Sequence, residues 1–133
     1  MKVRAKDLIA AAATARAGAV APYSGFQVGA ALLGKSGVIF GGANVESASY
    51  GLTCCAERVA LFKALTSGTR SFTAIAVVAR VKGGPMPCGA CRQLLAEYAR
   101  GARVYLADSD DLAKIRAFSI EKLLPSAFLG GDW

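Results

Sequence analysis

The 133-residue chain carries 16 Lys and Arg residues against 9 Asp and Glu residues, a formal net charge of +7, and it contains no histidine. Its length predicts a single domain spanning 1–133, because it is sufficient for one substantial core but not for two. The missing histidine excludes Cys/His zinc fingers, histidine-based triads and three-histidine hydrolytic sites. Any general acid or base must therefore be Glu, Asp, Lys, Tyr or Cys.

The apolar content is high for a lone soluble domain. Hydrophobic residues make up 54% of the sequence, and the mean hydropathy is +0.41. This composition predicts that some apolar surface is buried between subunits, with an alanine-rich monomeric core as the alternative. The basic residues are scattered from Lys2 to Lys122 without a run, which indicates diffuse solvated charge rather than a polyanion-binding surface.

Helices and strands are expected to alternate after an opening hairpin. Residues 3–17 predict an amphipathic helix rather than a secretory signal, because the apolar stretch is short and mostly alanine. Further helices are expected at 56–65 and 91–99, and strands at 26–32, 38–42, 73–79 and 102–107. Residues 118–124 combine a last short strand with a terminal helix. This order predicts an α/β fold in which helices cover both faces of a mixed sheet, and no apolar stretch approaches the length of a membrane span.

Two cysteine motifs carry the chemistry. They are Cys55-Ala56-Glu57 and Pro87-Cys88-Gly89-Ala90-Cys91. A structural zinc site uses four protein ligands, whereas a hydrolytic site leaves the fourth position to water. Three cysteines beside a glutamate that is too close in sequence to be a fourth ligand favour the hydrolytic kind. We therefore predict Cys55, Cys88 and Cys91 as Zn²⁺ ligands, in a pattern that is typical of zinc deaminases.

The residues next to Cys55 have separate predicted roles. Glu57 is the predicted catalytic acid and base, although a glutamate in a first helical turn would by itself be interpreted as a helix cap. Three thiolates leave a zinc ion with a net charge of −1, so Arg58 is predicted to compensate by hydrogen bonds to ligand sulfurs. A surface arginine is the alternative for Arg58. Cys54 is predicted to point away from the metal.

Three further segments make the chain similar to the small homotetrameric cytidine deaminases over nearly its whole length. They are Pro22-Tyr23-Ser24-Gly25-Phe26-Gln27-Val28-Gly29-Ala30, Asn44-Val45-Glu46-Ser47-Ala48-Ser49-Tyr50-Gly51-Leu52 and Leu123-Leu124-Pro125-Ser126-Ala127-Phe128. The resemblance implies a three-layer α-β-α fold with a mixed five-stranded sheet. It also implies Zn²⁺ as the metal and no organic cofactor.

The resemblance also implies which residues contact the nucleoside. Within one subunit these are Phe26 facing the pyrimidine, Asn44 and Glu46 on the ribose hydroxyls, and the Ala56 backbone on the base. The residues expected to reach into the sites of neighbouring subunits are Ala48, Tyr50 and Phe128. An amide and a carboxylate suit sugar hydroxyls, and aromatic rings suit a flat base. Without the resemblance, Phe26 and Phe128 would be interpreted as ordinary core residues.

The implied activity is hydrolytic deamination of cytidine and 2′-deoxycytidine to uridine and 2′-deoxyuridine, with release of ammonia, in pyrimidine salvage. Glu57 would carry the proton of the attacking water to the ring and then to the leaving amino group. The implied assembly is a homotetramer with shared sites and with no nucleic-acid or membrane partner. A zinc site of free thiols fits a reducing compartment, so the expected location is cytoplasmic.

Three alternatives are retained. A deaminase of another cytosine nucleoside, such as blasticidin S, shares the zinc motifs but lacks the Asn-x-Glu-x-Ala-x-Tyr arrangement that begins here at Asn44. A polynucleotide-editing deaminase fits the positive charge, but such enzymes usually carry a histidine ligand and additional elements that guide a strand. A non-catalytic interaction domain would use zinc only to stabilise its fold. The intact Glu57 argues against this last possibility.

Overall fold

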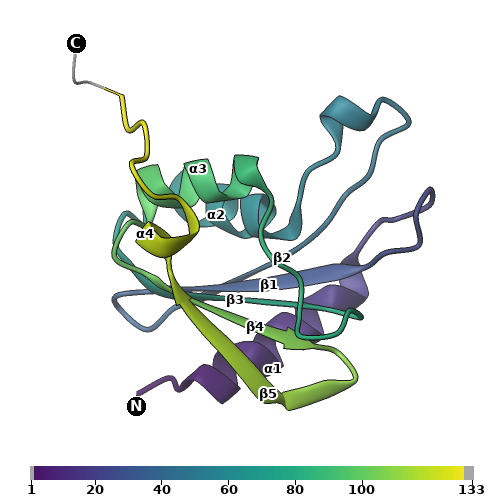
Figure 1. Cartoon of the computed structure of the whole chain (residues 1–133), viewed down its shortest axis with the longest axis horizontal. Helices are drawn as coiled ribbons and strands as arrows, with labels where there is room; N and C mark the ends of the chain where they lie inside the picture. The colour runs from purple at the N-terminus through teal and green to yellow at the C-terminus, as the bar shows by residue number, and fades with distance from the viewer. Residues whose placement is uncertain (1, 131–133) are drawn as a thin grey trace.

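The computed structural model describes residues 2–130, which form one five-stranded sheet with helices on both faces (Figure 1). The helices are α1 (Ala5–Ala15), α2 (Ala56–Thr66), α3 (Gly89–Tyr98) and α4 (Ile120–Leu123). The strands are β1 (Val28–Gly34), β2 (Ile39–Ala43), β3 (Phe72–Ala79), β4 (Arg103–Asp108) and β5 (Asp111–Ser119). The strand order is β2-β1-β3-β4-β5, and only the β3–β4 pair is parallel. The predicted three-layer α/β fold with a mixed five-stranded sheet is confirmed.

The sheet separates two apolar clusters. On one face, Leu8, Ile9 and Ala12 of α1 pack against inward-facing residues of β1 and β3. On the other face, Leu61 of α2 and Leu95 of α3 pack against the alternate residues of the same strands. Because side chains of a strand alternate between faces, a central strand covered on both sides must be apolar throughout. The sequence of β3, Phe-Thr-Ala-Ile-Ala-Val-Val-Ala, meets this requirement over its buried part, from Ala74 to Ala79.

Gly42 allows α2 to lie directly on β2. A Cβ atom at this position would be 2.5 Å from both the Ala56 carbonyl oxygen and the Ala60 backbone nitrogen. That separation is shorter than any ordinary contact, so only glycine permits this approach of helix and strand. The first turn of α2, which begins just after Cys55, is fixed against the sheet by this contact.

Two loops lie side by side at one end of the sheet, where α2 and α3 also begin (Figure 1). The loop after α1 contacts the loop after β2 through Val20, whose N–H donates 2.9 Å to the Asn44 carbonyl and whose carbonyl accepts 2.9 Å from the Glu46 N–H. The second loop then folds back on itself, because Val45 and Cys54 exchange backbone hydrogen bonds of 3.0 and 2.9 Å. Residues 44–46 are therefore held beside the start of α2.

The structure corrects several predicted boundaries. Strand β5 occupies Asp111–Ser119, whereas only a short strand near 118 was predicted; most of its side chains are exposed at the sheet edge, so no apolar pattern marks it. The first helix ends at Ala15 and continues as a 3-10 turn, Arg16–Gly18. Strand β1 begins at Val28 rather than at 26, and α3 begins at Gly89 rather than at 91. Within residues 2–130, no helix has the length and apolar character needed to cross a membrane.

Candidate active site at a three-cysteine cluster

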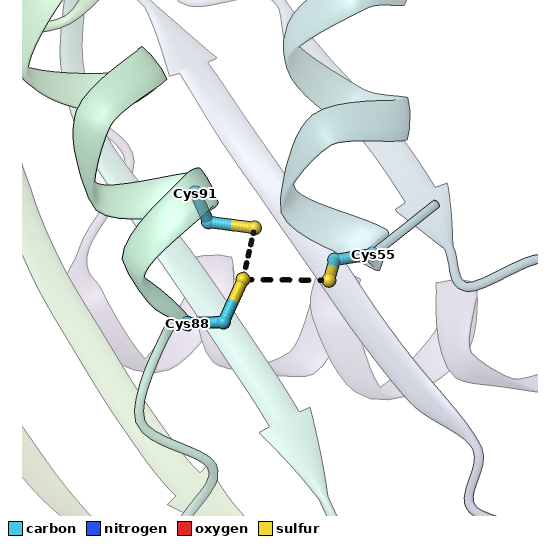
Figure 2. A group of neighbouring side chains, drawn as sticks. All are labelled: Cys55, Cys88 and Cys91. Atoms are coloured by element: carbon cyan, nitrogen blue, oxygen red, sulfur yellow. Dashed lines mark hydrogen bonds between the residues drawn. The ribbon is translucent and has the colours of Figure 1, made fainter. Parts of the chain in front are cut away.

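Three cysteine sulfurs converge between the starts of α2 and α3 (Figure 2). Cys55 and Cys88 are the residues immediately before α2 and α3, both with extended backbones, and Cys91 lies in the first turn of α3. Neither Cys55 nor Cys88 caps its own helix with its side chain, so both thiols are available to turn toward the cluster. The sulfur of Cys88 is 3.7 Å from that of Cys55 and 3.5 Å from that of Cys91.

The cluster has the dimensions of a zinc site. Zinc–sulfur bonds of about 2.3 Å in a tetrahedral arrangement place the sulfurs ~3.8 Å apart. The three sulfurs lie within 4.8 Å of one another, so one ion can contact all of them with little rearrangement. Two helix N-termini point their partial positive charge at this position, which favours thiolates. Cys54 is outside the cluster, and in the described part of the chain no fourth Cys, Asp or Glu joins it.

Hydrogen bonds between the thiols distribute their protons unevenly. The neighbouring Cys91 thiol, reinforced by the hydrogen bond from Arg58, lowers the pKa of Cys55 to about 5. The neighbouring Cys55 sulfur, together with burial, raises the pKa of Cys91 above its usual range. The surroundings of the Cys55 sulfur therefore favour its thiolate form. A metal ion that binds here displaces the remaining thiol protons, which makes its affinity dependent on pH.

The Arg58 guanidinium lies against the cluster. Its Nη2 donates a hydrogen bond of 3.3 Å to the Cys55 sulfur and a longer one of 3.4 Å to the Thr53 carbonyl oxygen. Its Nε is buried and has no hydrogen-bond partner among the described residues. A guanidinium in this position stabilises negative charge on a ligand sulfur, which is the effect that a site of three thiolates needs.

Glu57 is the second residue of α2 and is buried, with 6% of its surface exposed. Burial raises the pKa of its carboxyl group to about 7, and the charge of Cys55 adds to this effect. Hydrogen bonding of the carboxylate with the Glu57 backbone and with Cys91 acts in the opposite direction and lowers the pKa. The contact with Cys91 places the carboxyl group beside the metal position. A carboxyl group with a pKa near neutrality can both accept and return a proton, as a general acid and base must.

Asn44 and Phe26 are joined through the backbone. The Asn44 side chain is buried; its Oδ1 accepts 2.8 Å from the Val28 N–H and its Nδ2 donates 2.9 Å to the Phe26 carbonyl. The carboxamide thus makes the two backbone hydrogen bonds that a neighbouring strand would otherwise make at the beginning of β1. Phe26 is left just outside the strand with a partly exposed ring, which allows it to face a ligand.

Glu46 is held by the turn that precedes β1. Its Oε1 accepts hydrogen bonds from the Tyr23 and Ser24 backbone N–H groups at 3.0 and 3.1 Å, and its Oε2 accepts one from the Ser24 hydroxyl. These bonds from Ser24 and Tyr23 hold the pKa of Glu46 below its usual value. A cavity of about 320 Å³ adjoins the carboxylate; its lining residues are Tyr23, Ser24, Glu46, Ser47, Tyr50 and Thr53.

The remaining predicted contact residues lie on the surface. The exposed fraction is 80% for Tyr50 and 61% for Phe128, and Ala48 is also exposed. The Phe128 carbonyl accepts a 2.6 Å hydrogen bond from Gln93 Nε2, which ties the C-terminal segment to α3. Ala56 is the first residue of α2, where a backbone N–H has no partner within its own helix and can be donated to a ligand.

Two residues that contact the predicted site were not identified from the sequence. Ser24 binds Glu46, and Thr53 supplies the second acceptor for Arg58. The signal available for Ser24 was its position in the short turn segment Tyr23-Ser24-Gly25, where serine commonly hydrogen-bonds to nearby backbone. Nothing in the sequence distinguishes the Thr53 carbonyl, because any residue provides one.

The chain is similar to known proteins over nearly its whole length. Residues 3–107 match the family described as "Cytidine and deoxycytidylate deaminase zinc-binding region". A cytidine deaminase of Halalkalibacterium halodurans is 53% identical over 126 residues, covering 94% of each chain. One from Sporosarcina psychrophila is 50% identical over 128 residues, covering 96% of this chain and 93% of the relative. The crystal structure of cytidine deaminase from Burkholderia pseudomallei has a TM-score of 0.89 and 49% identity, covering 95% of this chain and 100% of that one.

The fold and the three-cysteine cluster define a zinc-binding deaminase. The matches extend over nearly the full chain, well beyond the metal motifs. The chain belongs to the cytidine deaminase family, whose members are enzymes, and its metal is zinc.

Proposed function

We propose that the protein hydrolyses cytidine and 2′-deoxycytidine to uridine and 2′-deoxyuridine with release of ammonia, in pyrimidine salvage. The observation that carries this proposal is the buried Glu57 carboxyl group beside three converging cysteine sulfurs. A purely structural zinc site has no use for a buried acid with a raised pKa, since burial of such a group lowers stability. A hydrolytic site needs one, because protons must be moved during the reaction.

We further propose that the substrate is bound by the loops at this end of the sheet. Asn44 and Glu46 hydrogen-bond to the sugar hydroxyls, and the Phe26 ring stacks on the pyrimidine. The Ala56 backbone N–H donates to the base from the start of α2. The Val45–Cys54 backbone pair supports this arrangement, because it holds the sugar-binding segment next to the zinc ligand Cys55.

In the proposed reaction a C–O bond forms at C4 of the base and the C4–N bond breaks. Cys55, Cys88 and Cys91 would hold the zinc ion, which would supply a water molecule of lowered pKa as the nucleophile near neutral pH. Glu57 accepts a proton from the attacking water and transfers it to ring N3, which makes C4 more electrophilic. Glu57 next takes the second proton of the attacking water, from the oxygen now bonded to C4, and carries it to the amino group, which departs as ammonia. The raised pKa supports this role, since the carboxyl group exchanges protons easily at neutral pH.

We propose a homotetramer in which Ala48, Tyr50 and Phe128 complete the sites of neighbouring subunits, and a cytoplasmic location. The exposure of the large apolar side chains Tyr50, Leu52 and Phe128 supports the assembly, because contact with another subunit would remove them from water. A contribution from a neighbouring subunit would also exclude water from the reacting base. The free thiols are consistent with a reducing compartment.

The test is an assay of ammonia release by the zinc-loaded protein. The substrates are cytidine, 2′-deoxycytidine, blasticidin S and a cytosine-containing oligonucleotide, and Glu57→Gln is the inactive control. Rapid release from the two nucleosides, with little from the other substrates, supports the proposal. Release of ammonia from blasticidin S alone, or from the oligonucleotide alone, would show that the proposed nucleoside substrates are wrong. Absence of release from every substrate, with one zinc bound per subunit, would leave a zinc-stabilised interaction domain.

A further inference from the structure

Ser24 contacts both of the elements that are proposed to hold the nucleoside. Its hydroxyl donates a hydrogen bond to Glu46 Oε2. The Ser24 hydroxyl oxygen also accepts a hydrogen bond of 2.9 Å from the Phe26 backbone N–H. Its own backbone N–H donates to Glu46 Oε1 at 3.1 Å. One small side chain therefore connects the carboxylate expected to bind the sugar with the backbone of the ring expected to face the base.

The segment around Ser24 is fixed at its other end as well. The Phe26 carbonyl accepts from Asn44, while its N–H donates to Ser24, so both polar backbone groups of Phe26 are occupied by side-chain hydrogen bonds. Gly25, between the two, has a φ of +70°, which permits the sharp turn. Its N–H donates 3.0 Å to the Ala21 carbonyl. Residues 24–26 are thus held in one conformation before a ligand binds.

The hydrogen-bond capacity of the Glu46 carboxylate is nearly used. An ionised carboxylate has about four acceptor positions. Two at Oε1 are taken by the N–H groups of Tyr23 and Ser24, and one at Oε2 is taken by the Ser24 hydroxyl. One position at Oε2 remains, which matches a single hydroxyl donor. Three donors in a rigid turn also prevent the carboxylate from rotating away from that direction.

We propose that Ser24 is a positioning residue for nucleoside binding, which orients the Glu46 carboxylate toward one sugar hydroxyl and aligns it with Phe26. The inference rests on the proposed function and adds to it the residue that determines how strongly the sugar contributes to affinity. Preorganised groups bind more tightly because no conformational freedom is lost when the ligand arrives. Without the Ser24 hydroxyl, Glu46 Oε2 is released to solvent and must be ordered again by each substrate.

The test compares two ligands in the zinc-loaded protein: cytidine as substrate and 2′,3′-dideoxycytidine, which lacks both ring hydroxyls, as competitor. In Ser24→Ala we expect KM for cytidine to rise about tenfold, the effect of a weakened hydrogen bond to a charged group. We expect kcat to change little and the inhibition constant of the dideoxynucleoside to stay the same. Ser24→Thr, which keeps the hydroxyl, should restore KM. Ser36→Ala, in the exposed turn between β1 and β2, is the matched control.

A general loosening of the turn would weaken both ligands equally, and that result overturns the proposal, as does an unchanged KM for cytidine. If Ser24→Ala does not fold, Ser24→Cys gives the same comparison, because it keeps the size and replaces a strong donor by a weak one. In a Glu46→Gln background, Ser24→Ala should add no further loss for cytidine, and an additive loss contradicts the proposal. A wild-type protein inactive on cytidine refutes the proposed function as well, whereas an active one with equal weakening refutes this inference alone.

Discussion

The Arg58 guanidinium donates a 3.3 Å hydrogen bond to the sulfur of Cys55, the residue that precedes α2. Cys55 precedes α2 and Arg58 lies in its first turn. The chain therefore supplies a metal ligand and its compensating charge within four residues. A zinc ion with three thiolates has a net charge of −1, and this contact brings the local charge back to zero.

From this contact we expect Arg58→Gln to weaken zinc binding by about 10- to 100-fold, as is typical when a partner of a ligand is lost. Competition with a chelator measures the change. Arg70→Gln is the control, because Arg70 donates only to carbonyls near the far end of α2. Equal zinc affinities in the two variants would contradict the role of Arg58.

Substitution of each ligand should separate the four cysteines. Cys55→Ala, Cys88→Ala and Cys91→Ala should lose the single zinc ion of each subunit and also lose stability, because metal binding and folding are coupled. Cys54→Ala should keep both, since Cys54 lies outside the cluster. Metal analysis and thermal unfolding make the comparison. Zinc retained in Cys88→Ala but lost in Cys54→Ala would overturn the ligand assignment.

Glu57→Gln should keep fold and zinc while kcat falls by at least ~10²–10⁴-fold, the usual contribution of general acid–base help. The fall should lie at the upper end or beyond, because the carboxyl group is proposed to act at two steps. Since burial disfavours the carboxylate, the neutral amide should leave the melting temperature unchanged or raise it. A zinc-loaded variant with a near wild-type kcat would exclude the proton-transfer role.

Glu46 should titrate below the ordinary glutamate value of 4.5 in the folded protein, because the bonds from Ser24 and Tyr23 favour its ionised form. The carboxylate then stays charged from neutral pH down past 4.5. Its contribution to stability is complete above that value and is lost as the pH falls through the lowered pKa. Carbon-13 NMR of labelled glutamates, assigned with Glu46→Gln, measures the midpoint. Ser24→Ala should move it upward, and a wild-type midpoint at or above 4.5 would disprove the effect.

Light scattering should show a homotetramer, and deletion of residues 128–133 should impair catalysis. The reason is that Phe128 is proposed to enter a neighbouring site. Zinc content per subunit should be retained, because the ligands lie at the starts of α2 and α3, far in sequence from the deleted residues. Deletion of residues 131–133 alone serves as the control that keeps Phe128. A fully active monomer at assay concentration would refute the shared site but not the zinc chemistry.

The metal site was predictable because its signal is local. Cys88 and Cys91 are one helical turn apart, and Cys55 with Glu57 begins another helix, so spacing alone placed the reactive groups at helix starts. The buried strands were predictable for a similar reason. A strand such as β3, covered on both faces, has to be a continuous apolar run.

What could not be predicted depends on contacts between distant or exposed residues. Strand β5 is exposed along most of its length, so its pairing with β4 leaves no trace in the apolar pattern. The bonds from Ser24 to Glu46 cross 22 positions between two irregular loops, where no periodicity applies. The hydrogen bonds of the Asn44 carboxamide to the backbone of Phe26 and Val28 likewise form only when the two loops lie side by side, so the sequence does not reveal them.

Cys55 and Cys88 lie 33 positions apart in the chain, yet their sulfurs are separated by 3.7 Å. A metal ion bridging them closes a loop that contains all of α2 and the central strand β3. Closing a loop of this length removes about 3 kcal/mol of chain entropy from the unfolded state. The ion therefore acts as a reversible cross-link as well as a reagent, and a chelator that stops turnover should also make the middle of the sheet exchange its amide hydrogens faster.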